Sequence, residues 1–387
     1  MDLNIYKRAT YYCLSIFVFS VVSLLLLPNA RANESSPAYI GTSSAECQEA
    51  EEKKQFNAGA VIIEHIINSY EWHICDWKGK HISIPLPVIL IENGQLHVFS
   101  SARFHHGKAA YRGFKIWHEP GLKKGRIVKI DDEGNINKNA SLIDISITKN
   151  VLSLFMAFTF ILIMLISMAK GYQKRGDGAP RGVARVVEPF VLFVRDDIAR
   201  PAIGHKYGRF LPFLLTLFFF IFFNNLLGLI PFFPGGANLT GNISVTLVLA
   251  LFTFFVTNVS GNKNYWMHIV NTPGVPWWLK FPLPLMPIVE LVGVITKPVV
   301  LMIRLFANIS AGHIICLGFI SLIFIFGQMA PTAGYGVSVF SVFFFLFMSL
   351  LELLVAFIQA FVFTLLSALY IGMAVEEHHH EAAEEVK

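Results

Sequence analysis

Charged residues are scarce in this sequence. Only 15% of its 387 residues are charged, whereas 54% are hydrophobic, and Phe alone occurs 36 times. A soluble domain carries about a quarter charged residues, so this composition excludes an ordinary water-soluble globular protein. The apolar residues form long runs, which are typical of membrane-spanning helices. The net charge of +5 does not indicate nucleic-acid binding, because nine Lys and Arg residues fall in one segment between two apolar runs, residues 170–209.

Cysteine is also scarce, with four in the chain. Cys316 falls in an apolar run and is interpreted as a packing residue. Cys47 and Cys75 are the only pair in a more polar segment, residues 33–148. A disulfide would persist there if the segment is exported, but spacing alone does not show that two cysteines meet, so the bridge stays open.

The same polar segment holds seven of the thirteen histidines. They include His73, two residues before Cys75, and the pair His105-His106. None of these residues has a spacing diagnostic of metal ligands, so we interpret them as surface histidines and expect no metal or cofactor in the chain.

The N-terminus resembles a secretory signal. Lys7 and Arg8 precede an apolar stretch, residues 13–27, which is followed by Pro28 and an A-x-A-like site at residues 30–32. This pattern predicts a signal peptide over residues 1–32. The alternative, a short first transmembrane helix, stays open, although the stretch is shorter than the ~20 residues that a span needs.

Residues 33–148 are predicted to form a small extracytoplasmic α+β domain. Helical spacing covers residues 55–70, and the run at 82–91 predicts a hairpin with 96–100 through Glu92-Asn93-Gly94. Further strands are expected near residues 126–130 and 142–148, around a turn at Glu133-Gly134.

Residues 149–377 are predicted to be the membrane domain. Apolar spans are expected at 151–168, 210–230 and 243–259, and the basic segment 170–209 is interpreted as a cytoplasmic loop. The connection at 231–241 has no Lys or Arg and is assigned to the outside, whereas Lys263 and Lys280 mark a short inner loop. Residues 378–387 are then a cytoplasmic tail.

The last two apolar stretches, residues 283–326 and 339–373, are longer than a single upright span. Helices of this length exceed ~50 Å, whereas the hydrocarbon core is ~30 Å thick. We expect a long inclined hairpin joined by residues 327–336. The predicted fold is therefore an all-α polytopic membrane protein with about five hydrophobic passes and a small N-terminal α+β domain.

Ionisable residues inside this hairpin mark the candidate site, because charge within a membrane is costly and by default functional. Glu290, Lys297, Arg304 and Asn308 fall within about 40° on one helical face. Small residues flank Arg304 at Ala307 and at position 311, which lets another helix approach closely.

The partner side chains of the hairpin can exchange protons, whereas Arg304 cannot lose its own. His313 points about 180° away from Arg304, and Glu352 and Gln359 share one face of the other helix. One blocking face and one relaying face suit a proton pathway in two halves. The alternative, in which Arg304 only forms an ion pair with Glu290 or Glu352, stays open.

Three stretches of the hairpin closely resemble the a subunit of F-type ATP synthases. They are ELVGVITKP at 290–298, RLFANISAGH at 304–313 and QAFVF at 359–363. The resemblance extends from about residue 150 to Glu377 and includes NNLLGLIP at 224–231 and YIGMAVEE at 370–377.

This resemblance implies a stator beside a rotating ring of c subunits, with the b-subunit peripheral stalk and the other synthase subunits as partners, in a bacterial inner membrane. Protons would enter one half-channel, bind a ring carboxylate and leave through the other half-channel. It implies that Arg304 separates the halves and faces the ring, while Asn308, His313, Glu352 and Gln359 line or support the paths. Many bacterial members have an acid at the position of His313 and a histidine at that of Glu352, so we interpret the two residues as a coupled pair.

Rival functions predict features that the sequence does not have. A stand-alone ion channel or secondary transporter predicts an internal repeat or a substrate-sized polar cavity, and neither is evident. A membrane haem enzyme needs paired buried histidines, whereas the spans offer only His313. No G-x-x-x-x-G-K-[ST] loop occurs, so we expect a non-catalytic, ion-translocating subunit whose partner chains carry the ATP chemistry.

Overall fold

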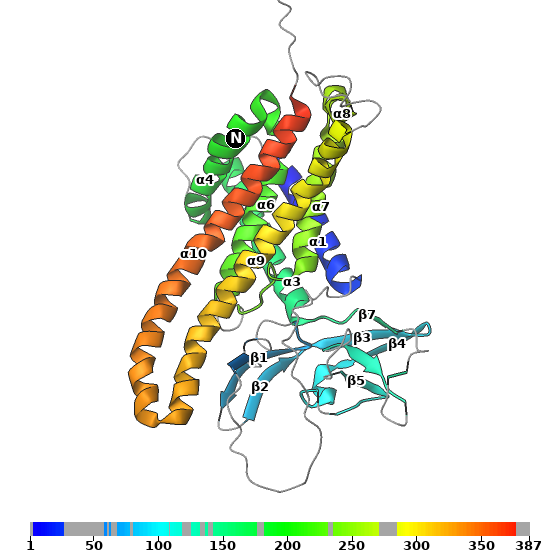
Figure 1. The fold of residues 1–387 in the computed structure, drawn as a ribbon. Coiled ribbons are helices and arrows are strands. Elements are labelled where there is room, and N and C mark those ends of the chain that lie inside the picture. Colours follow the sequence, from blue (N-terminus) through cyan, green and yellow to red (C-terminus); the bar gives the residue numbers. More distant parts are fainter. Residues whose placement is uncertain are drawn as a thin grey trace, which may run out of the picture.

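The computed structural model contains a helical bundle, a long helical hairpin and a small strand domain (Figure 1). The structure describes residues 3–26, 58–59, 62, 68–77, 80–107, 109–117, 125–131, 136–137, 142–175, 182–230, 235–270 and 285–376.

The described residues of the strand domain form three small antiparallel sheets. The first pairs β1 with β2, the second has the order β4-β3-β7, and the third pairs β5 with β6. A short 3₁₀ helix, Ser101–Phe104, follows β4. The strands are β1 Glu71–Trp77, β2 Lys80–Pro85, β3 Pro87–Glu92, β4 Gln95–Ser100, β5 Phe114–Ile116, β6 Ile127–Lys129 and β7 Leu142–Asp144.

A compact apolar core joins the β4-β3-β7 sheet to the β5-β6 sheet. Val88 and Leu90 of β3 are fully buried against Phe104 and Phe114, and Phe99 of β4 packs on the same cluster. Because alternate residues of a strand point to opposite faces, one face of the β4-β3-β7 sheet is buried in this core. The hairpin through Asn93-Gly94 is confirmed: both residues have positive φ, as a two-residue type I′ turn requires.

The prediction of one continuous strand over residues 82–91 was wrong. The run is broken at Leu86 into β2 and β3, which belong to different sheets. Pro85 and Pro87 flank the break, and proline cannot donate a ladder hydrogen bond, which ends the pairing there. Most of the predicted helix at 55–70, the turn at 133–134 and Cys47 lie outside the described residues, as does the side chain of Cys75.

The prediction of about five hydrophobic passes is confirmed. Within the described part of the chain, five helical runs are long and apolar enough to cross a membrane: residues 149–171, 184–229, 243–260, 287–329 and 331–375. The corresponding helices are α3 Lys149–Arg175, α6 Tyr207–Leu229, α7 Ile243–Ser260, α9 Leu285–Met329 and α10 Pro331–Val375.

The segment 170–209, expected as a loop, is largely helical. It holds α4 Val183–Phe193, a π-helical turn Val194–Ala199 and α5 Arg200–Ile203 before α6 begins. Its apolar residues Val187, Val191, Val194 and Ile198 recur at helical spacing and are buried. The basic residues Arg185, Arg200, Lys206 and Arg209 are exposed, so the apolar stripe packs while these charges face outward. The expected inner loop likewise begins with a helix, α8 Lys263–Val270.

The N-terminal segment forms helix α1, Leu3–Leu26, which contacts α3, α6 and α7 (Figure 1). Ala9, Cys13 and Ile16 are fully buried, and the Thr216 hydroxyl donates a hydrogen bond of 3.0 Å to the carbonyl oxygen of Ala9. A first transmembrane helix, the alternative to a signal peptide, would have to pack against the other helices in this way. Cleavage of residues 1–32 stays a prediction.

The long hairpin runs obliquely across α6 and α7, as Figure 1 shows. Its connection is much shorter than the expected 327–336, because α9 ends at Met329 and α10 begins at Pro331. Ala330 is extended, as a residue before proline prefers, and Pro331 fits the first turn of a helix. Gly334 has no side chain to separate it from the backbone of Gly327, which lets the two helices meet closely at the turn.

Candidate functional site

Arg304 lies midway along α9 on a face that the chain leaves open. Arg304, Ala307, Asn308 and Ala311 are all exposed, whereas Leu305 of the same helix is fully buried. Among the described residues, Arg304 makes no hydrogen bond or ion pair, so it is not paired with Glu290 or Glu352. The guanidinium therefore stands among small side chains on an uncovered helix surface, an arrangement that suits a partner with a negative charge.

His313 and Glu352 face each other across the hairpin. The distance from His313 Nδ1 to Glu352 Oε1 is 3.0 Å, and the side chains are 17% and 7% exposed. The pair is ionic when His313 is protonated, and the contact at Oε1 lacks the geometry of a hydrogen bond. A carboxylate and an imidazole in this contact can pass a proton between them, which an arginine cannot.

Two further residues of α9 position the Glu352 carboxylate. The Cys316 thiol donates a hydrogen bond of 3.3 Å to Glu352 Oε2. Gly312 leaves room for the other oxygen, because a Cβ at this position would lie only 2.9 Å from Oε1. Interpreting Cys316 as mere packing was incomplete: it lies one turn after His313, and both residues contact the same carboxylate.

Buried polar groups on α6 and the following loop support the α10 side of this site. The Asn225 side chain donates to the carbonyl oxygen of Ala356 at 3.4 Å and accepts from the Thr240 hydroxyl at 2.7 Å. Gly228 lies beside the imidazole of His313, where a Cβ would be 3.6 Å from Nε2. Gln359, the predicted partner residue two turns after Glu352, is buried as well.

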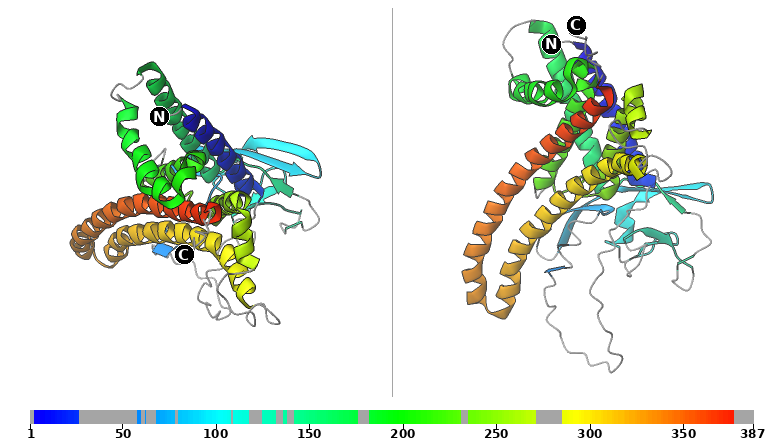
Figure 2. Two further views of the ribbon diagram at one scale, coloured as in Figure 1. Left: turned by 90° about the horizontal axis from the view of Figure 1, so that it is seen from above. Right: turned by 45° about the horizontal axis from the view of Figure 1, so that its top comes forward.

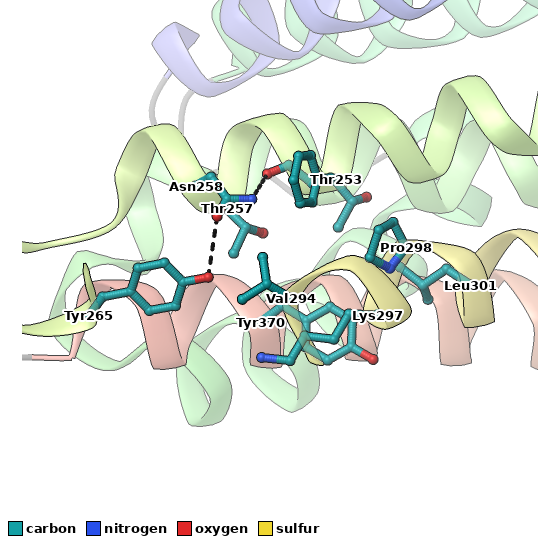
Figure 3. Close-up of a pocket in the computed structure, with 10 residues that line it drawn as sticks. Thr253, Thr257, Asn258, Tyr265, Val294, Lys297, Pro298, Leu301 and Tyr370 are labelled. Carbon is teal, nitrogen blue, oxygen red and sulfur yellow. Dashed lines mark hydrogen bonds between the residues drawn. The ribbon is translucent and has the colours of Figure 1, made fainter. Parts of the chain in front are cut away.

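A second polar site surrounds Lys297, toward the start of α9 (Figure 3). A small pocket there is lined from α7, α8, α9 and α10 and has room for roughly one water molecule. The Lys297 ammonium lies 5.3 Å from the centre of the Tyr370 ring, a cation–π distance. The Thr257 hydroxyl is buried at the pocket and has no hydrogen-bond partner in the part of the chain that the structure describes.

Two hydrogen bonds fix the α7–α8 wall of the Lys297 pocket, and both are drawn in Figure 3. Asn258 donates to the carbonyl oxygen of Phe254 at 2.8 Å, and the Tyr265 hydroxyl donates to Asn258 Oδ1 at 3.3 Å. Burial raises the pKa of the Tyr265 phenol, and the negative charge of Glu290 raises it further. Glu290 thus acts electrostatically on the pocket from the first turns of α9.

The two polar sites lie on opposite sides of Arg304 along one helix. Lys297 is seven residues before Arg304 and His313 is nine residues after it, or about 10 Å and about 13 Å along the axis. Within the described residues, no group of three or more His, Cys, Asp or Glu side chains is arranged to hold a metal ion. The chemistry available here is proton exchange at two polar sites with a permanent positive charge between them.

Comparison with known proteins identifies the family of the membrane part of the chain. Residues 151–372, more than half of the chain and all of the site, match the family described as ATP synthase A chain. The chain belongs to this family. Residues 61–145 match a second family, described only as a domain of unknown function (DUF8433).

Named relatives are similar over 62–69% of the chain. "ATP synthase subunit a" of Chloroherpeton thalassium is 44% identical over 248 residues, covering 62% of this chain and 70% of the relative. "ATP synthase subunit a 2" of Chlorobium luteolum is 45% identical over 246 residues, covering 62% and 68%. "ATP synthase subunit a" of Myxococcus xanthus is 42% identical over 277 residues, covering 69% of this chain and 86% of the relative.

The structure separates the predicted site residues into three groups. His313 and Glu352 meet, Arg304 and Asn308 share an open face, and Lys297 stands apart in its own pocket with Glu290 nearby. Sequence reasoning missed the residues that position or line these groups, which are Gly312, Cys316, Asn225, Thr240, Thr257, Tyr265 and Tyr370. Signals existed for some of them: Cys316 follows His313 at i+3, and Gly312, Asn225 and Tyr370 lie in the stretches that resemble the family.

Proposed function

We propose that this chain is the proton-conducting a subunit of the membrane sector of a rotary F-type ATP synthase. One half-channel contains His313 and Glu352, the other contains Lys297 and Glu290, and Arg304 separates them. Protons cross by loading and unloading the carboxylates of a c-subunit ring that turns against the open face of α9. The observation that carries this proposal is the place of Arg304, exposed on an uncovered face between two polar sites.

The open faces of the hairpin support a protein partner over a stand-alone channel. Large apolar side chains are exposed along both helices, and the exposed arginine lies among them. A charge facing hydrocarbon costs at least ~2.5 kcal/mol, so a ring carboxylate opposite Arg304 would stabilise the hairpin as well as carry the proton. The other synthase subunits, including the b-subunit peripheral stalk, are expected as further partners.

Arg304 supplies the barrier because its charge is permanent. A free proton is repelled by the guanidinium, whereas a ring carboxylate that approaches it is drawn into its ionised form. The carboxylate therefore gives up its proton on one side of Arg304 and gains one only on the other side. Proton flow is thereby coupled to rotation of the ring.

The test compares Arg304→Ala and Arg304→Lys with Ile303→Ala, a control at the adjacent, exposed and uncharged position of α9. In vesicles with the assembled synthase, Arg304→Ala should abolish proton-driven ATP synthesis. In vesicles from which the catalytic head has been removed, passive proton leak through the same variant should persist or rise. Arg304→Lys should also fail, because an ammonium enclosed between α9 and the ring can lose its proton and lacks the planar fork of arginine. Near-parental synthesis by Arg304→Ala would refute the proposal.

We further infer that the strand domain lies in the periplasm of a bacterium and that the chain is inserted in the inner membrane. The basic residues of the segment 170–209 support this orientation, since Lys and Arg favour the cytoplasmic side. A reporter fused near Gly134 should be active in the periplasm, and one fused within 176–182 in the cytoplasm. The reverse pattern would overturn the orientation, and the mass of the mature N-terminus would decide whether residues 1–32 are removed.

A further inference from the structure

The strand domain carries an aliphatic face that no described residue covers. We define the aliphatic face as Ile89, Ile91, Leu96, Val98 and Ile143, all on the β4-β3-β7 sheet. Leu96, Val98 and Ile143 are 63%, 56% and 47% exposed. Exposed apolar clusters of this kind in a soluble domain mark interaction sites.

The register of the sheet places these five side chains together. Ile91 is paired with Leu96 on one side and with Ile143 on the other, and Ile89 is paired with Val98. The intervening residues of β3 point the opposite way into the domain core, so the aliphatic face is no extension of that core. Its neighbours along the same face, Pro87, Ser100 and Ile145, carry no charge.

The sheet is joined to the membrane domain without a free linker. Beyond β7 the chain still bonds to β3, with Ile145 N–H donating to the Ile89 carbonyl and Ile147 N–H to the Pro87 carbonyl. The first residue of α3, Lys149, then donates its N–H to the Ser69 carbonyl. Ile143 is six residues before α3, so it lies within about 20 Å of the start of this membrane helix.

The figures show which way the aliphatic face is turned. In Figure 1, β5 lies on the side of the β4-β3-β7 sheet that is away from the helices, and the core residue Phe114 belongs to β5. The aliphatic face is therefore turned toward the helices. Seen from the helix end (Figure 2, left), the cyan strands extend to the side of α1, and no helix lies over them.

We propose that the aliphatic face docks on the lipid surface of the leaflet in which α3 begins. The region above the sheet and beside the bundle is where lipid surrounds a membrane protein, and an uncharged aliphatic surface there suits the interfacial region of a bilayer. The domain is then held at the membrane by α3 on one side and by lipid contact on the other. This inference rests on the membrane location of α3 and not on the proposed proton path.

The test places a benzophenone amino acid at Leu96 or Val98, with Gln95 as the matched control. Gln95 is exposed in the same strand, but its side chain points to the opposite face of the sheet. The variants are irradiated in native membranes with the full complex, and adducts are identified by mass. We expect lipid adducts at Leu96 and Val98, at least tenfold more than at Gln95.

The other outcomes overturn the proposal. Adducts to another subunit, or to a second copy of this chain, would identify a protein as the occupant, and absence of adducts at both positions would mean that the face is solvated. The unmodified chain provides a second measurement in case a variant fails to assemble. A photoactivatable phosphatidylcholine should label the peptide containing residues 95–100 and spare the one containing 126–130, and equal labelling of both would refute lipid docking.

Discussion

The substitution Gly312→Ala should perturb the proposed proton path without destabilising the hairpin. Gly312 lies inside α9, where Ala is favoured over Gly by about 1 kcal/mol, so the substitution should leave folding unchanged or stabilise it. The new Cβ would lie 2.9 Å from Glu352 Oε1, 3.1 Å from Cδ and 3.3 Å from Cγ. These atoms belong to a flexible side chain, so the carboxylate moves and the backbone does not.

The size of the effect follows from the same distances. An ordinary contact between a methyl carbon and an oxygen is about 3.4 Å or more, so Oε1 must shift by roughly 0.5 Å. A shift of this size away from α9 lengthens the 3.0 Å ion-pair contact with His313 to about 3.5 Å. At an effective dielectric constant of ~20 this weakens the attraction by roughly 0.8 kcal/mol, which corresponds to a proton flux reduced roughly fourfold.

The assay is ATP-driven proton pumping in vesicles, with the thermal stability of the purified complex measured alongside. Gly318→Ala is the matched control, because Gly318 lies in the same helix and a Cβ there would meet nothing within 4 Å. We expect normal pumping by Gly318→Ala and slow pumping by an equally stable Gly312→Ala complex. If the two variants pump alike, the His313–Glu352 contact is not part of the proton path.

Three other predictions address the pair, its thiol and the strand domain. The double variant His313→Glu/Glu352→His should conduct more protons than either single variant, because it restores one acid and one base. A double variant that conducts no better than the worse single variant would argue against coupling. Cys316→Ala should lower proton flux several-fold, whereas Cys316→Ser should lower it less because serine keeps a hydrogen-bond donor to Glu352. Equal losses of flux in the two variants would show that the thiol only packs. Burial and the neighbouring Asp144 raise the pKa of Tyr70, whose hydroxyl donates to that carboxylate. The protonated phenol therefore stabilises the folded domain fully below its unfolded pKa of about 10, and this contribution is lost as the pH rises above that value. The free energy of unfolding of the strand domain, measured with urea, should thus fall above pH ~10 in the parent. Tyr70→Phe should be less stable at neutral pH and lack this alkaline loss, and an unchanged loss in Tyr70→Phe would assign it to another group.

The membrane part of the fold was predictable because its signals are local. Long apolar runs gave α3, α6, α7, α9 and α10, and the excess length of the last two gave a hairpin. The segment 170–209 was predicted to be a loop because it is rich in charged residues. Its apolar residues nevertheless recur at helical spacing and form a buried stripe. The length of the connection between α9 and α10 was overestimated, because Gly327 and Gly334 let the two helices pack closely up to Ala330.

The candidate site was predictable only where the chemistry depends on a single residue and not on contacts between distant segments. An arginine inside an apolar helix is conspicuous, and Arg304 needs no partner within the chain to be noticed. The surroundings of Glu352 depend on contacts between segments far apart in the sequence, such as Cys316 beside Glu352 or Thr240 beside Asn225. The Lys297 pocket likewise combines four helices, whose relative placement no local pattern contains.

The junction between β7 and α3 has a consequence for measurement. Because backbone hydrogen bonds continue from the sheet to the first residue of α3, the strand domain and this helix should turn as one rigid piece. A probe attached to the strand domain would then report the tilt of α3 without any label inside the membrane. If a ring turns against α9, as proposed, and pushes the chain sideways, the displacement should be measurable outside the bilayer as a rocking of this domain.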